Sequence, residues 1–147
     1  MPAWITNFPF IPLPRALILL RLVTAGLFMA HAAVRIINGT IPQFGGFMEN
    51  LGFPAGEAWV WAITAWEIIG GLAMIFGFYV RVAASGLFAI AGVGIILIHR
   101  HLGWFVGEHG TGGSEYSVAL MMMLLVIMAT ARANNQAAGQ AAGQAAG

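Results

Sequence analysis

One carboxylate in this sequence lies where an ionised side chain is costly. Glu67 is the only charged residue in the apolar run 58–78. Ionisable groups inside membrane spans are rare, usually face other helices or a water-filled cavity, and mark candidate functional sites. The first question is therefore which cation meets Glu67.

The preceding apolar run, 16–37, carries the candidate partners. Arg21, Thr24, Phe28, His31 and Arg35 recur at spacings of three and four residues. This spacing places them on one face of a helix. We expect that face to point toward the neighbouring helix that carries the acid, because lipid cannot solvate the charges.

The depth of each residue selects a partner. A helix rises about 1.5 Å per residue, and counting from Arg15 and Phe78 places Glu67 between Arg21 and His31 in depth. We therefore predict that Glu67 pairs with Arg21 or accepts a hydrogen bond from His31. Gly70 and Gly71 follow one turn later and would let a backbone or a ligand approach closely.

Three roles fit such a cluster. A buried pair can fix the register of two helices without any chemistry. A polar group in an apolar slot can hold the carbonyl of a quinone. Ionisable groups inside a membrane can also move a proton or an ion. The residues alone leave all three open.

A second group of possible ligands lies in the loop after the third apolar run. The stretch HRHLGWFVGEHG contains His99, His101, Glu108 and His109, and histidine and carboxylate side chains bind metals. His31 and His99 are also both near one membrane boundary, where two histidines could hold a haem. We predict no metal centre, with His99, His101 and His109 as the weak candidates, and a quinone as the cofactor to consider.

Composition explains what must position these side chains. The chain is 60% hydrophobic and 7% charged, whereas soluble domains carry about 25% charged residues. Four apolar runs, 16–37, 58–78, 82–98 and 116–131, approach the roughly 20 residues that cross a bilayer. There is no cysteine, so redox chemistry would need a bound cofactor or a partner. The net charge of +1 argues against nucleic acid as a partner.

These runs predict an all-α integral membrane four-helix bundle with up-down-up-down topology. The expected helices are about 16–37, 58–78, 80–99 and 115–133, in a transmembrane domain over 1–133. Arginines 15, 81 and 132 share one side, which places both termini in the cytoplasm. Three QAAG units in 134–147 predict a low-complexity flexible tail.

Two motifs, in this order and spacing, resemble the DoxX family of small bacterial membrane proteins. They are the E-x-x-G-G-L-x-x-x-x-G-x-x-x-R element of residues 67–81 and the G-G-x-E-Y element of residues 112–116. An early arginine in RLVTAGLFMAHAAVRI adds to the resemblance, which covers about 14–131. Arg35 departs from it, because lysine is frequent there in the family. The polar positions that the resemblance carries over are Arg21, His31, Arg35, Glu67, Arg81 and Glu115.

The resemblance implies a multi-pass protein of the bacterial inner membrane in a redox context. The family includes the membrane subunit of a thiosulfate:quinone oxidoreductase. We therefore expect a subunit of a quinone-linked redox or respiratory complex, not catalytic alone, whose partners are the bilayer and other subunits or further copies of itself. The alternative is a non-catalytic accessory subunit that packs against a larger membrane complex.

Overall fold

The computed structural model describes residues 8, 10–105 and 112–145, and in these residues it contains helices and no strand. The elements are α2 (Leu13–Ile37), α3 (Ile41–Asn50), α4 (Gly56–Phe76), α5 (Val80–Leu97), the short 3₁₀ helix η1 (His99–His101) and α6 (Glu115–Ala145). Four of these helical segments are long and apolar enough to cross a membrane. The predicted all-α four-span bundle is therefore confirmed, whereas the side of the membrane on which the termini lie stays a prediction.

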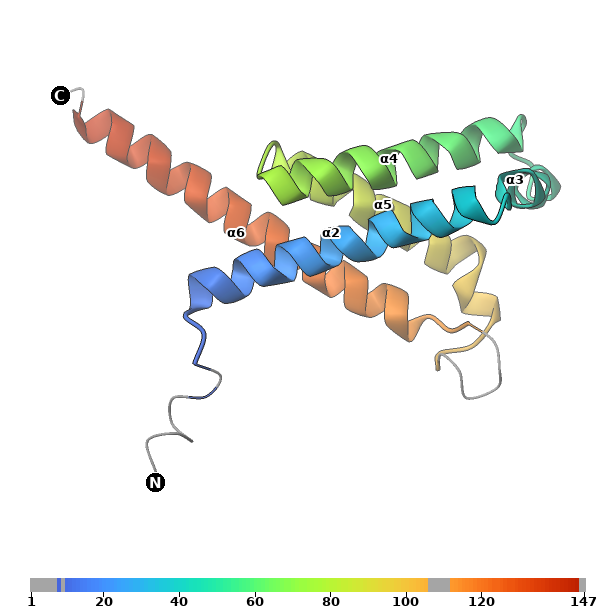
Figure 1. Cartoon of the computed structure of the whole chain (residues 1–147), viewed down its shortest axis with the longest axis horizontal. Coiled ribbons are helices and arrows are strands. Elements are labelled where there is room, and N and C mark those ends of the chain that lie inside the picture. Colours follow the sequence, from blue (N-terminus) through green and yellow to red (C-terminus); the bar gives the residue numbers. More distant parts are fainter. Residues whose placement is uncertain (1–7, 9, 106–111, 146–147) are drawn as a thin grey trace.

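The four long helices form a closed ring of neighbours. Helix α2 packs on α4, α4 on α5, α5 on α6, and α6 back on α2. Helix α6 crosses the other helices obliquely and extends past them, and the start of α2 lies at the same end of the bundle as the end of α6 (Figure 1). We call this the arginine end. The opposite end, where α2 and α5 finish and α4 and α6 begin, is the loop end.

Turn chemistry explains the tight connection between α4 and α5. Gly77 adopts a left-handed conformation with φ +82°, which a residue without a Cβ reaches at little cost. The next amide, of Phe78, donates to the carbonyl of Ala73 at 2.9 Å, which closes the helix end. Only three residues separate the two helices, so α4 and α5 are antiparallel neighbours.

The core lies between α2, α4, α5 and α6 and combines alanines with larger apolar side chains. Its buried members include Ala25, Phe28, Met74, Ala84, Leu87 and Leu124. Gly71 brings α2 close to α4, because a Cβ there would lie 2.9 Å from Met29 Sδ and 3.4 Å from the Ala25 carbonyl oxygen. This confirms close backbone approach at Gly71.

Two helix boundaries differ from the sequence prediction by three residues or more. Helix α2 begins at Leu13, three residues early, because Pro14 is tolerated in the first turn of a helix. Helix α6 continues through the QAAG units to Ala145, where a flexible tail was predicted. Alanine and glutamine favour helix, so an existing helix propagates easily into this segment.

Candidate functional site

The partner of Glu67 is Arg35. The Arg35 guanidinium donates from Nη1 to Glu67 Oε2 at 2.7 Å and from Nη2 to Glu67 Oε1 at 3.5 Å. The arginine and glutamate side chains are 15% and 5% exposed. The pair thus joins α2 to α4 inside the bundle, shielded from lipid.

Thr64 completes the polar contact one turn before Glu67. Its hydroxyl accepts a hydrogen bond from Arg35 Nη1 at 2.7 Å and donates to the Val60 carbonyl at 2.7 Å. Thr64 is buried, so both bonds are shielded from water. The arginine is therefore fixed by two residues of α4 rather than by charge alone.

Replacing Thr64 by valine should weaken this arrangement without removing a charge. We expect a loss of about 1–2 kcal/mol in the free energy of unfolding, because a buried donor loses its acceptor. Denaturation with SDS in mixed micelles, followed by circular dichroism, measures it. Thr130→Val is the matched control, since the Thr130 hydroxyl donates only to Ile127 of its own helix. Equal losses in both variants would contradict the role of Thr64.

Helix α3 covers the pair from the loop end. The Arg35 guanidinium carbon lies 5.7 Å from the centre of the Phe44 ring, a cation–π contact. Helix α3 is held there by close packing on the start of α4: a Cβ on Gly56 would overlap the Gly45 carbonyl. The Gly56 amide also donates to Glu49 Oε1 at 3.1 Å.

A pocket of about 530 Å³ opens beside the ion pair at the loop end. This loop-end pocket is lined by residues of every long helix, of α3 and of the segment after α5. They are Phe28, His31, Arg35, Phe44, Met48, Phe53, Trp59, Ile63, Glu67, Ala89, Ile90, Ala91, Val93, Gly94, Leu97, Ile98, His99, Tyr116, Ser117 and Leu120. Its volume lies within the roughly 300–1,000 Å³ of small-molecule sites, and such sites combine apolar walls with a few polar groups in the same way.

Further polar groups reach the pocket from other elements. The rings of His31 on α2 and Tyr116 on α6 lie 6.1 Å apart. His99, on η1, has a buried Nδ1 with no hydrogen-bond partner among the residues that the structure describes. A buried polar atom without a partner costs free energy, so this nitrogen is suited to bind a ligand atom.

The structure separates the residues that the sequence analysis grouped. His31, Arg35 and Glu67 share the loop-end pocket. Arg21 and Arg81 line a different cavity at the arginine end. Glu115 is the first residue of α6, directly before the pocket residue Tyr116.

The predicted pairing of Glu67 with Arg21 or His31 is wrong because the start of α2 and the end of α4 do not lie at the same depth. Arg21 lies beside Gly77 at the end of α4: both its terminal nitrogens are 3.8 Å from where a Gly77 Cβ would be. Residues 13–20 of α2 therefore extend past α4, which moves Glu67 about one turn toward Arg35. Long side chains on a helix also point toward its N-terminus, so Arg35 reaches back to Glu67.

The structure describes only some of the loop residues considered as metal ligands. In the described residues no three histidine, cysteine or acidic side chains are placed to hold a metal ion. His101 accepts a hydrogen bond from Arg100 at 3.1 Å, and His109 lies outside the described residues. His31 and His99, considered above for haem, line the same pocket.

Sequence reasoning missed several residues of the candidate site. Thr64 could have been found, because it lies three residues before Glu67 and so on the same helix face. Tyr116 and Phe44 could not, because their positions depend on how α6 and α3 pack. His99 was considered only as a metal or haem ligand.

Comparison with known proteins decides the family. The family model described as DoxX matches residues 16–100, more than half of the chain. The chain belongs to the DoxX family. The match covers α2 to α5 and includes both residues of the ion pair.

One DoxX-like relative has a name that indicates a redox function. The chain is 34% identical over 115 residues to "Putative oxidoreductase CatD" of Bacillus subtilis (strain 168), which covers 77% of each chain. No solved structure matches the chain. The DoxX match and the four spans together make this a multi-pass membrane protein.

Proposed function

We propose that this DoxX-family protein binds a quinone in the loop-end pocket and serves as the membrane subunit of a quinone-linked redox assembly. One observation carries the proposal: a buried Arg35–Glu67 pair forms part of the wall of an otherwise largely apolar pocket. A bound quinone accepts electrons and protons as it becomes a quinol. The proposal concerns how this chain's residues would hold it.

Arg35 supplies the donors for one carbonyl oxygen. A guanidinium has five N–H donors, and the bonds to Glu67 and Thr64 use two on Nη1 and one on Nη2. Two donors are therefore left for a ligand. Glu67 and Thr64 act as positioning residues, because they fix the plane and the direction of the guanidinium.

The pocket also suits the rest of the quinone. The buried Nδ1 of His99, which belongs to another element, has no partner in the described residues. In its protonated form this nitrogen would donate a hydrogen bond to the second carbonyl, and by gaining or losing the proton the ring would act as a proton carrier. Phe28, Leu97 and Leu120 offer apolar surface to a ring and its hydrocarbon tail. The site lies within the spans, where a lipid-soluble ligand can enter from the bilayer.

The redox context rests on two points. The relative from Bacillus subtilis carries an oxidoreductase name. The chain itself has no cysteine to carry electrons, so a redox reaction would use the bound quinone and an electron donor from outside the chain. Purification from native membranes in a mild detergent, with extraction of quinone and identification of co-purifying chains, tests this assignment. A preparation that repeatedly yields this chain alone, with no quinone, contradicts it.

Quinone affinity gives the sharper test. Titration of the purified protein with a short-chain ubiquinone should quench the fluorescence of Trp59, which lines the pocket. We expect Glu67→Gln to lower the affinity about tenfold, because the Arg35 donors lose their fixed direction. Arg100→Gln, on the exposed side of η1, should leave the affinity unchanged.

Two tryptophans distinguish pocket binding from partition into the micelle. Trp59 and Trp61 are similarly exposed, at 50% and 52%, but only Trp59 lines the pocket. Trp59→Phe should remove most of the saturable quenching, whereas Trp61→Phe should retain it. Equal effects of these two substitutions, or unchanged affinity in a folded Glu67→Gln protein, would reject the quinone site.

A further inference from the structure

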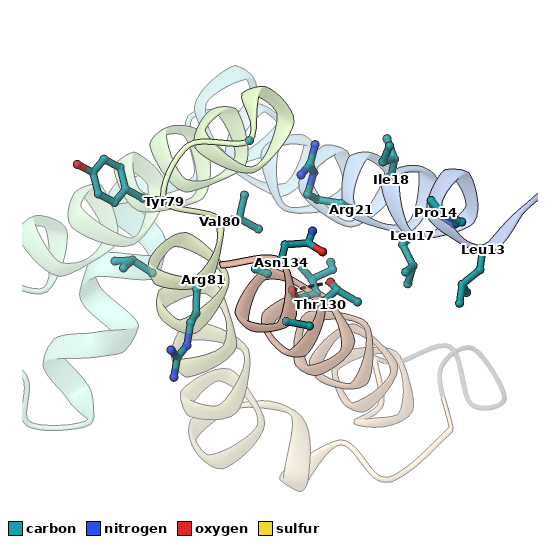
Figure 2. A pocket seen from close by; sticks show the side chains of 15 residues that line it. Leu13, Pro14, Leu17, Ile18, Arg21, Tyr79, Val80, Arg81, Thr130 and Asn134 are labelled. Carbon is teal, nitrogen blue, oxygen red and sulfur yellow. Dashed lines mark hydrogen bonds between the residues drawn. The ribbon is translucent and has the colours of Figure 1, made fainter. Parts of the chain in front are cut away.

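A second cavity, of about 910 Å³, lies at the arginine end and shares no residue with the loop-end pocket. We call it the terminal groove. It runs between the first turns of α2, the turn before α5 and the last membrane-spanning part of α6. Figure 2 shows Leu13 and Leu17 pointing from α2 toward α6, with Val80 and Thr130 further along the groove.

Arg21 is the polar anchor of the terminal groove. Its Nε is buried and has no hydrogen-bond partner in the described part of the chain. Its terminal nitrogens lie against Gly77, at the carboxyl end of α4. The dipole of α4 favours a cation there, but it leaves the Nε–H without an acceptor. An anionic oxygen would supply one.

The depth of Arg21 matches a lipid headgroup. Helix α4 has 21 residues, so it is about 31 Å long and covers the hydrocarbon core of a bilayer. Gly77 directly follows its last residue, and the neighbouring Arg21 is therefore at the membrane interface. The groove wall next to Arg21 includes the apolar side chains of Val80 and Ile127.

The charged residues in the segments that form the arginine end are all arginines. Arg15, Arg21, Arg81 and Arg132 all belong to segments that form the arginine end, and no acid occurs in residues 1–48, 68–107 or 116–147. The nearest glutamate along α4, Glu67, is bound to Arg35. In Figure 2 the Arg81 side chain points away from Arg21, so the two arginines are separate charges at the groove.

We propose that the terminal groove binds an anionic phospholipid. Its phosphate would accept hydrogen bonds from Arg21, and one acyl chain would lie along Val80 and Ile127. Basic pockets between membrane helices bind anionic headgroups in this way. An anionic phospholipid carries a net negative charge and is attracted to four arginines that have no acid in the same segments. A zwitterionic phospholipid carries no net charge, so its electrostatic attraction to them is weaker.

Lipid competition tests the proposal. The delipidated protein in a neutral detergent is mixed with equal amounts of phosphatidylglycerol and phosphatidylcholine of the same acyl chains, and native mass spectrometry counts the bound molecules. We expect one retained phosphatidylglycerol, with a preference of about tenfold over phosphatidylcholine. Arg21→Gln should abolish the preference, and Arg100→Gln, which removes the same charge at the loop end, should keep it.

Several results would overturn the proposal. A wild-type protein without a preference overturns the proposal, and this result does not depend on whether any variant folds. A preference that survives in Arg21→Gln, or that falls equally in Arg21→Gln and Arg100→Gln, also overturns it, because the binding would then depend on net charge alone. Displacement of the lipid by one equivalent of a short-chain quinone would instead make the groove a quinone site.

Discussion

Replacing Arg35 by methionine is expected to lower the free energy of unfolding by about 3–5 kcal/mol, because it leaves the Glu67 carboxylate buried without a cation. The carboxylate side chain is only 5% exposed, so neither water nor lipid headgroups can compensate. SDS denaturation in mixed micelles measures the loss. The matched control is Arg21→Met, which removes an arginine from the same helix without breaking an ion pair.

The double variant Arg35→Met/Glu67→Met separates stability from ligand binding. Replacing both members of a buried pair by apolar residues is often neutral or stabilising, so most of the lost stability should return. Quinone affinity should not return, because Arg35 is the proposed carbonyl donor. A double variant that is stable and still binds quinone with wild-type affinity would show that the pair only fixes helix register.

A methyl group on Gly56 is expected to displace α3. The Cβ of alanine there would overlap the backbone carbonyl of Gly45, and backbone cannot turn aside as a flexible side chain can. Overpacking of this kind costs about 1–3 kcal/mol and sometimes more. Phe44 and Met48 of α3 line the loop-end pocket, so quinone affinity should fall together with stability.

Proteolysis reports the displacement directly. A glutamate-specific protease cleaves after Glu49 and Glu57, at the end of α3 and the start of α4, and cleavage should accelerate in Gly56→Ala. Gly46→Ala is the control within α3, because nothing lies within 4 Å of its Cβ position. If both variants were cleaved at the wild-type rate, α3 would not depend on this contact.

The predictability of the site differs from residue to residue. Glu67 was found because a single charge in the run 58–78 has to be neutralised inside the bundle. Its partner was assigned wrongly because the depth count assumed that the start of α2 and the end of α4 lie at the same depth. The contacts of Gly71 with Met29 and of Gly77 with Arg21 set a different register. No periodicity within either helix contains that information.

The loop-end pocket illustrates the same limit. His31 and Arg35 could be placed on one helix face from their spacing, and the structure has both in the pocket. Phe44 reaches Arg35 only because α3 folds back onto the start of α4, where two glycines allow backbone contact. The unpartnered Nδ1 of His99 likewise depends on how the segment after α5 turns.

By itself, the sequence determined that this protein has four membrane-spanning helices and an acid that must find a cation among them. It could do so because the solvent of a segment follows from composition, and because backbone groups in lipid have to be paired within a helix. The tertiary structure alone decided that the cation is Arg35 and that Arg21 stands at a separate groove. Helix register depends on which side chains and glycines meet across the interface, and these contacts form only when the helices pack.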